Sequence, residues 1–137
     1  MRLPDERGSV AVEAVFFVPL VVVVLLAIVA GGRLVEAKAD VHAATREAAR
    51  AASLRGTTAG ATAAAEQSVE DALIRRRRPC TSWHTTVDTS RLRPGGVVTV
   101  DVTCTVPLAD LGLPGVPASR SIQARVTVPI DPQAVRP

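Results

Sequence analysis

The longest hydrophobic block of the chain lies near its N-terminus, where no charged or strongly polar side chain occurs from Ala14 to Ala30. With the small and apolar residues on either side, the tolerable span reaches roughly 23 residues, or about 34 Å of helix, enough to cross a bilayer core. The block is apolar all round, whereas a helix packed on a soluble core keeps a polar face. Pro19 removes one backbone hydrogen bond and predicts a kink. The pattern therefore predicts a membrane helix over residues 9–32.

The segment that follows the block has the composition of a helical stalk. Leu34–Leu54 lacks proline and is rich in alanine, so we expect the helix to continue out of the membrane. Small residues let helices approach closely, so its apolar seam suits either the chain's own domain or a neighbouring subunit. The seam consists of Val41, Ala44, Ala48 and Ala52. After a Gly- and Thr-rich break, a second helix is predicted over residues 62–76, and the stalk is assigned to residues 33–78.

The C-terminal part of the chain has the pattern of a small sheet. Two segments, Val98–Val106 and Ile122–Val128, alternate apolar and polar residues with a period of two, which is typical of half-buried strands. A weaker strand is predicted over Ser82–Asp88. Pro94–Gly96 predicts the first turn, and a Pro- and Gly-rich connection over residues 107–119 leads to the last strand. We therefore expect a three-stranded antiparallel sheet within residues 79–137, and the α+β fold class for the whole.

The two cysteines flank the first hairpin of this predicted sheet. If the hairpin has its midpoint near Leu92, Cys80 and Cys104 lie opposite each other at bridging distance. That register turns Trp83 and Val87 away from the apolar face of the next strand, which a bulge or a one-residue shift would correct. A disulfide closing about 25 residues would contribute roughly 3–4 kcal/mol and would indicate an oxidising exterior. Two reduced cysteines are the alternative.

Composition excludes most enzyme classes. The chain has 137 residues, is 47% hydrophobic and only 2% aromatic, which leaves room for one small domain and an anchor. Such a domain is too small for a deep catalytic pocket, and no Gly-rich phosphate loop follows a strand. Two cysteines are too few for a four-ligand zinc site unless both histidines join them. We expect no enzymatic activity, no catalytic residue, no metal and no cofactor.

The chain has a formal net charge of +3. Four of its basic residues form a continuous run, Arg75–Arg78, at the end of the second predicted helix. Cations are favourable at a helix C-terminus, so the run is interpreted as a solvated cap. Contact with anionic lipid or wall polymer is the alternative. Nucleic-acid binding would need a supporting aromatic or basic surface, which the sequence lacks.

Glu13 is a carboxylate at the start of the predicted span. At a bilayer centre a carboxylate costs about 2.5–3.5 kcal/mol and less near the interface, so a headgroup-level position is the plain interpretation. However, Gly8 and Ser9 stand just upstream, and the apolar run follows at once. With this arrangement the chain resembles type IV pilin-like precursors. In that family a prepilin peptidase cuts after a Gly on the cytoplasmic side, and a Glu stands five residues beyond the cut.

A closer resemblance is to the TadE-like branch of the tight-adherence pilus system. Those proteins have a Val-Glu pair, a Pro within the apolar run and a Gly-Arg pair after it, followed by an Ala-rich helix with Arg. The matching residues are Val12, Glu13, Pro19, Gly32 and Arg33. The resemblance covers about residues 7–55.

The resemblance implies a minor pilin or pseudopilin-like subunit with a structural role. The peptidase would cut between Gly8 and Ser9 and remove a cytoplasmic leader, residues 1–8. Glu13 of a neighbouring subunit would then pair with the new amine of Ser9 and set the helix register. The implied partners are a prepilin peptidase, other pilin-like subunits with their assembly machinery, and membrane lipid, but no nucleic acid. The short N-terminal tail and the downstream cysteines favour a single-pass protein of the cell membrane with its N-terminus in the cytoplasm and its C-terminal domain outside. The resemblance adds a surface filament as a further location.

Two other interpretations remain open at this point. The chain is alternatively a single-pass anchored binding module whose helix is only an anchor. A secreted protein is the third interpretation, because Ala37–Lys38–Ala39 has the small-x-small pattern of a signal cleavage site, although it lies well beyond the apolar run.

Overall fold

The computed structural model describes residues 7–77, 79–112 and 114–133, with side chains placed from residue 12 onward. The elements in chain order are α1 (Arg7–Ser53), α2 (Thr58–Arg75), β1 (Ser82–Asp88), β2 (Val97–Pro107), a short 3-10 helix η1 (Ala109–Leu111) and β3 (Ser119–Pro129). The predicted α+β class is confirmed. The predicted leader, residues 1–8, lies almost wholly outside the described residues.

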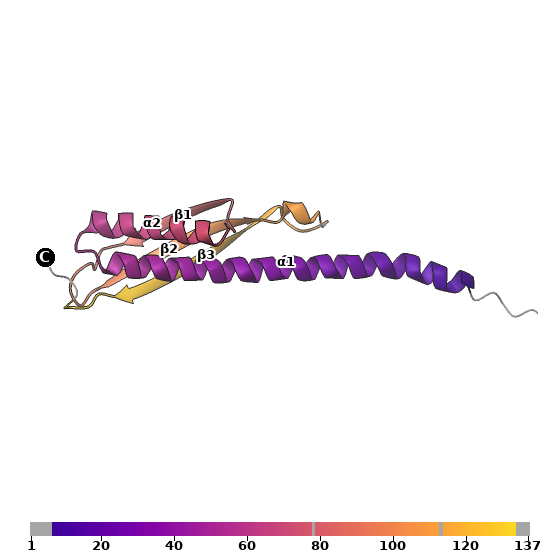
Figure 1. Ribbon diagram of the computed structural model, residues 1–137, viewed down its shortest axis with the longest axis horizontal. Coiled ribbons are helices and arrows are strands. Elements are labelled where there is room, and N and C mark those ends of the chain that lie inside the picture. The colour runs from indigo at the N-terminus through magenta and orange to yellow at the C-terminus, as the bar shows by residue number, and fades with distance from the viewer. Residues whose placement is uncertain (1–6, 78, 113, 134–137) are drawn as a thin grey trace, which may run out of the picture.

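Helix α1 is 47 residues long and continues from the apolar block into the Ala-rich segment without a break (Figure 1). Pro19 lies inside it, and the kink expected there stays a prediction. Gly31 and Gly32 are also helical, and a Cβ on either would meet no other atom within 4 Å. The helix therefore carries the apolar block as a rod that is continuous with the folded domain.

Helix α2 begins four residues earlier than the predicted Thr62 and ends at Arg75. The expected Gly- and Thr-rich break is shorter because Thr57 caps the helix: its side-chain oxygen accepts a hydrogen bond from the Gly60 amide at 3.2 Å. At the other end Arg77 adopts a left-handed φ of 61°, and its amide bonds the carbonyl of Ile74 at 3.1 Å. A left-handed residue directly after the C-cap is a common way to end a helix.

The sheet is a three-stranded antiparallel meander in the order β1-β2-β3, as predicted. The expected register of the first hairpin is wrong, because Trp83 rather than Cys80 lies opposite Cys104. The shift is three residues, an odd number, so it places Trp83 and Val87 on the same face as the buried residues of β2. The apolar face of β1 thus decides the register.

The turn between β1 and β2 depends on two glycines. Pro94 and Gly95, with φ 75° at Gly95, stand at the centre of a turn that the Gly96 amide closes on the Arg93 carbonyl at 2.8 Å. Positive φ at the third position is the requirement of a type II turn. A Cβ at Gly96 would stand 2.0 Å from the Arg91 carbonyl oxygen, so glycine is required there as well.

The core lies between the helices and one face of the sheet. Helix α1 packs against β2 and β3, and α2 packs against α1 and β1. All four seam positions of α1 are buried, so the seam serves the chain's own domain. Alanines of the helices pack against valines of the strands. Such small side chains allow close packing, which explains how a chain with only 2% aromatic residues forms a core. The core includes Val41, Ala44, Ala48, Ala52, Ala65, Val69, Leu73, Val98, Val100, Val102 and Cys104.

Candidate membrane and assembly site

The N-terminal part of α1 extends away from the folded domain (Figure 1). Its large side chains are exposed, for example Phe16 at 75% and Val15 at 68%. Its most apolar window has a mean hydropathy of 3.0 and is only 6% buried. Apolar surface of this extent is unfavourable in water, at about 25 cal/mol per Å². This helix is long and apolar enough to span a membrane, which is consistent with single-pass anchoring.

Glu13 is the only charged residue from Val12 to Gly32. Its side chain is exposed, and it makes no hydrogen bond or ion pair with the side chains that the structure describes. Gly8 and Ser9 are in the first turn of α1, where backbone N–H groups have no partner within the helix. Ser9 and Glu13 are four residues apart in this helix. The cut after Gly8 and the role of Glu13 stay predictions.

Two arginines of the basic run at the end of α2 form ion pairs with acids of α1. Arg76 contacts Asp40 at 3.3 Å and Glu47 at 3.0 Å, and Arg75 contacts Glu47 at 2.9 Å. The interpretation of a solvated cap is therefore wrong for Arg76, whose side chain is only 27% exposed, whereas Arg75, at 62%, is largely solvated although it pairs with Glu47. Arg77 is exposed, and Arg78 lies outside the described residues.

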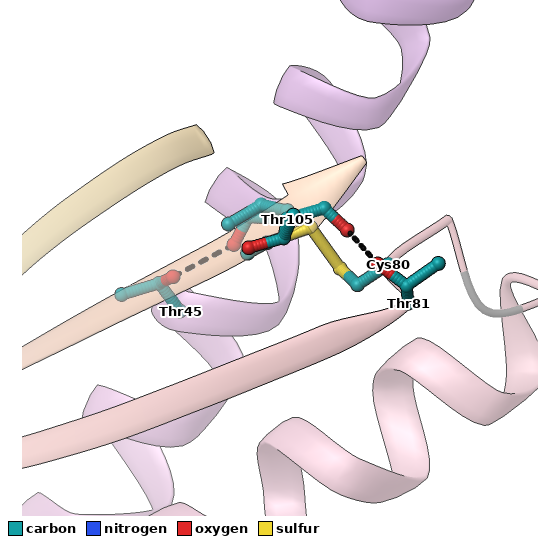
Figure 2. The surroundings of a disulfide bond; sticks show 6 residues. Thr45, Cys80, Thr81 and Thr105 are labelled. Carbon is teal, nitrogen blue, oxygen red and sulfur yellow. Dashed lines mark hydrogen bonds between the residues drawn. A yellow bond between two sulfur atoms is a disulfide. The ribbon is translucent and has the colours of Figure 1, made fainter. Parts of the chain in front are cut away.

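Cys80 and Cys104 form the expected disulfide, with 5.5 Å between their Cα atoms (Figure 2). Because the register differs from the expected one, Cys80 reaches Cys104 from the residues before β1 and not from a position opposite it. The Thr81 amide and hydroxyl both donate to the Thr105 carbonyl, at 2.8 and 3.0 Å. The disulfide and these bonds fasten the connection after α2 to the central strand.

One contact of the site escaped the sequence analysis. Arg33, directly after the span, forms an ion pair with Asp110 of η1 at 2.6 Å. The hydrogen bond from Arg33 lowers the pKa of the Asp110 carboxyl below its ordinary value. Because 77 positions separate the two residues in sequence, no local pattern predicts the contact. It fixes the β2–β3 loop to the C-terminal end of the apolar segment.

Among residues 12–77, 79–112 and 114–133, no group of three or more His, Cys, Asp or Glu side chains is placed to hold a metal ion. What the arrangement offers is a long apolar helix, one acid near its start and a small disulfide-bonded domain at its other end.

These features are consistent with a protein anchored by a single helix and carrying a folded C-terminal domain. Residues 8–50 match the family model described as TadE-like protein, which confirms the resemblance over this segment. The match includes Gly8, Ser9, Glu13 and Pro19 and ends within the buried part of α1, so α2 and the sheet lie outside it. No curated protein and no solved structure matches the chain. The TadE-like segment and the apolar helix together fit a pilus-related membrane subunit.

Proposed function

We propose that the protein is a minor pilin or pseudopilin-like subunit that a prepilin peptidase processes and that acts structurally in pilus or secretion-pseudopilus assembly. The observation that carries the proposal is the TadE-like match over residues 8–50, because it contains both the cleavage position and the acid five residues beyond it. TadE-like pilus proteins are structural components, in keeping with a role that needs no catalytic centre.

The free part of α1 supports an assembly role beyond anchoring. Almost all of its apolar surface is exposed in the described chain, so lipid or other helices must cover it. Before assembly the bilayer supplies that cover, and in a filament neighbouring copies of the helix replace it. Removal of residues 1–8 takes away the charged headpiece that holds the precursor at the cytoplasmic face.

Glu13 gives the helices a defined register. Peptidase cleavage after Gly8 leaves a positive amine on Ser9 in an environment of low dielectric. A carboxylate from the neighbouring subunit compensates that charge, whereas any other register leaves two uncompensated charges in an apolar layer. The pairing thus contributes specificity of alignment rather than a large net stabilisation.

The alternative function is an anchored binding module outside the membrane, with no filament role. The free helix alone fits this alternative equally well. The acid within the TadE-like segment favours the assembly role, because a carboxylate at the apolar end of a helix that serves only as an anchor costs insertion free energy and contributes nothing to anchoring.

Substitution of Glu13 tests the assembly role. We expect Glu13→Ala to insert into the membrane normally and to reduce filament formation severely, because the Ser9 amine loses its partner. Glu36→Ala is the matched control: Glu36 is also an exposed acid on α1, but it lies beyond the span. Membrane fractionation and counts of surface filaments give the two readouts. Normal filaments with Glu13→Ala would contradict the register role.

A further inference from the structure

The β2–β3 loop, Pro107–Ser119, is unusually apolar for an exposed connection. Asp110 is its only charged residue. Most of its described residues are exposed, and Val116, at 38%, is among the few large apolar side chains exposed outside the α1 span. Exposed loops normally carry polar side chains, so the composition needs a reason beyond chain connection.

The loop lies at the end of the domain that faces the apolar segment of α1. The ion pair between Arg33 and Asp110 places η1 level with the end of the span. Figure 1 shows the loop, drawn in orange, extending beyond the rest of the sheet in the direction of the α1 N-terminus. Leu26 and Ala30, inside the predicted span, are half-buried, and their helical spacing continues the buried seam. The loop therefore reaches the depth at which the helix meets the membrane.

The charge and the backbone of the loop suit a partly apolar environment. Its single carboxylate is paired with a guanidinium, so no isolated charge is desolvated. Pro114 and Pro117 have no N–H group, which removes two donors that lipid would leave unsatisfied. The Leu108 amide bonds the Ala118 carbonyl at 2.7 Å and closes the loop at its base. The remaining backbone groups need water, which limits the loop to the interfacial layer.

Basic residues flank the loop at this end of the domain. Arg120 is the second residue of β3, beside the loop, and Arg77 is exposed at the end of α2, whereas Arg33, directly after the span, is paired with Asp110. Cations at headgroup level are attracted to anionic phospholipid. An apolar tip with a basic margin is the pattern of a surface that rests on a bilayer.

We propose that the Pro107–Ser119 loop is a second membrane contact, which rests in the interfacial layer of the leaflet on the domain's side, with its basic margin at the lipid phosphates. The inference rests on the membrane anchoring proposed above and adds a function for the loop. Two contacts, the span and the loop, fix the tilt and rotation of the domain relative to the bilayer. A domain held in this way presents the same surface to every neighbour before assembly.

Tryptophan quenching in vesicles tests the proposal with the full chain. Trp83 is the only tryptophan, so Trp83→Phe provides a silent background. In this background a single new tryptophan reports one place: Val116→Trp reports the loop, and Phe17→Trp reports the span. Leu54→Trp reports the end of α1 that is far from the span. The native Phe17 and Leu54 side chains are 57% and 65% exposed. The vesicles contain phosphatidylcholine and phosphatidylglycerol whose acyl chains are brominated either near the headgroup or near the chain end.

We expect the Val116→Trp emission to shift to the blue and to be quenched several-fold more by bromine near the headgroup than by bromine near the chain end. Leu54→Trp should not be quenched. If Val116→Trp behaves like Leu54→Trp while Phe17→Trp is quenched, the loop contact is wrong and the anchor stands. If Phe17→Trp is not quenched either, the anchoring fails and the loop contact fails with it. Pro117→Trp, at another exposed loop position, serves as the second reporter if Val116→Trp does not fold.

Quenching at different protein-to-lipid ratios separates lipid from a neighbouring copy as the occupant. A loop that contacts lipid is quenched most in dilute vesicles. A loop that is protected from bromine at every ratio, including the most dilute, would overturn the proposal.

Discussion

The disulfide between Cys80 and Cys104 is expected to supply a large share of the stability of the folded domain. Replacing both cysteines, as Cys80→Ala with Cys104→Ala, removes a cross-link between positions separated by 24 in sequence. In the chain-entropy model a loop of this length stabilises by about 3.5 kcal/mol. Small domains have only about 5–15 kcal/mol in total. The variant should therefore lose between about a quarter and about two thirds of its free energy of unfolding.

Trp83 gives a local probe of this loss, because it lies opposite Cys104 and is partly buried against the core. Its fluorescence reports the domain, whereas helix content in detergent also includes the span. At roughly 4–8 °C per kcal/mol, the melting temperature should fall by roughly 14–28 °C. The buried position of Cys104 adds a small cavity to the loss.

Reduction is the matched control for this prediction. Reductant should lower the stability of the native chain to nearly that of the double variant and leave the variant itself unchanged. A loss below about 1 kcal/mol on either treatment would refute the reasoning, because the cross-link would then constrain the unfolded chain far less than its loop length requires.

Three further predictions concern ion pairs and packing. Glu47→Ala removes the acid shared by two α2 arginines, and because these groups are partly exposed the free energy of unfolding should fall by no more than about 1 kcal/mol in urea titration. Ala48→Leu overpacks a fully buried position and should cost about 1–3 kcal/mol, whereas Ala63→Leu on an exposed face of α2 should be nearly neutral. The pKa of Asp110 is lowered in the folded protein, so the Arg33 pair stabilises above the ordinary value of 3.8, and this contribution is lost as the pH falls through the lowered value. NMR titration of this carboxyl should show its pKa rise toward 3.8 in Arg33→Gln, and an unchanged value would contradict the assigned cause.

Local patterns in the sequence were sufficient to predict the fold class. The period-two alternation of β2 and β3 and the all-apolar start of α1 depend on neighbouring residues only, so they are visible without a structure. The start of α2 was missed because one hydroxyl, that of Thr57, outweighs the low helix propensity of the residues that follow it.

Long-range geometry could not be predicted in the same way. The register of β1 on β2 depends on how the turn around Gly95 is built and on which face of β1 must be buried, and a hairpin midpoint alone misplaced it by three residues. The contacts of Arg76 with Asp40 and of Arg33 with Asp110 join segments far apart in the chain. No periodic pattern indicates them.

The proposed assembly residues could be predicted from the sequence, but their contacts cannot be seen in a single chain, because their proposed partners belong to other molecules. Gly8, Ser9 and Glu13 were found through a local motif, and the TadE-like match covers all three. Glu13 has no hydrogen-bond or ion-pair partner among the described side chains, and its proposed partner is the Ser9 amine of another subunit. The test of these residues therefore lies in the processed and assembled protein.

The N-terminus of the protein extracted from membranes is the most direct test of the central claim. Intact-mass and N-terminal peptide mass spectrometry should find a chain that begins at Ser9, in material that needs detergent to dissolve. A chain that retains residues 1–8 would contradict peptidase processing and leave the anchored module, and one that begins near Asp40 would indicate a secreted protein without the helix on which the whole proposal depends.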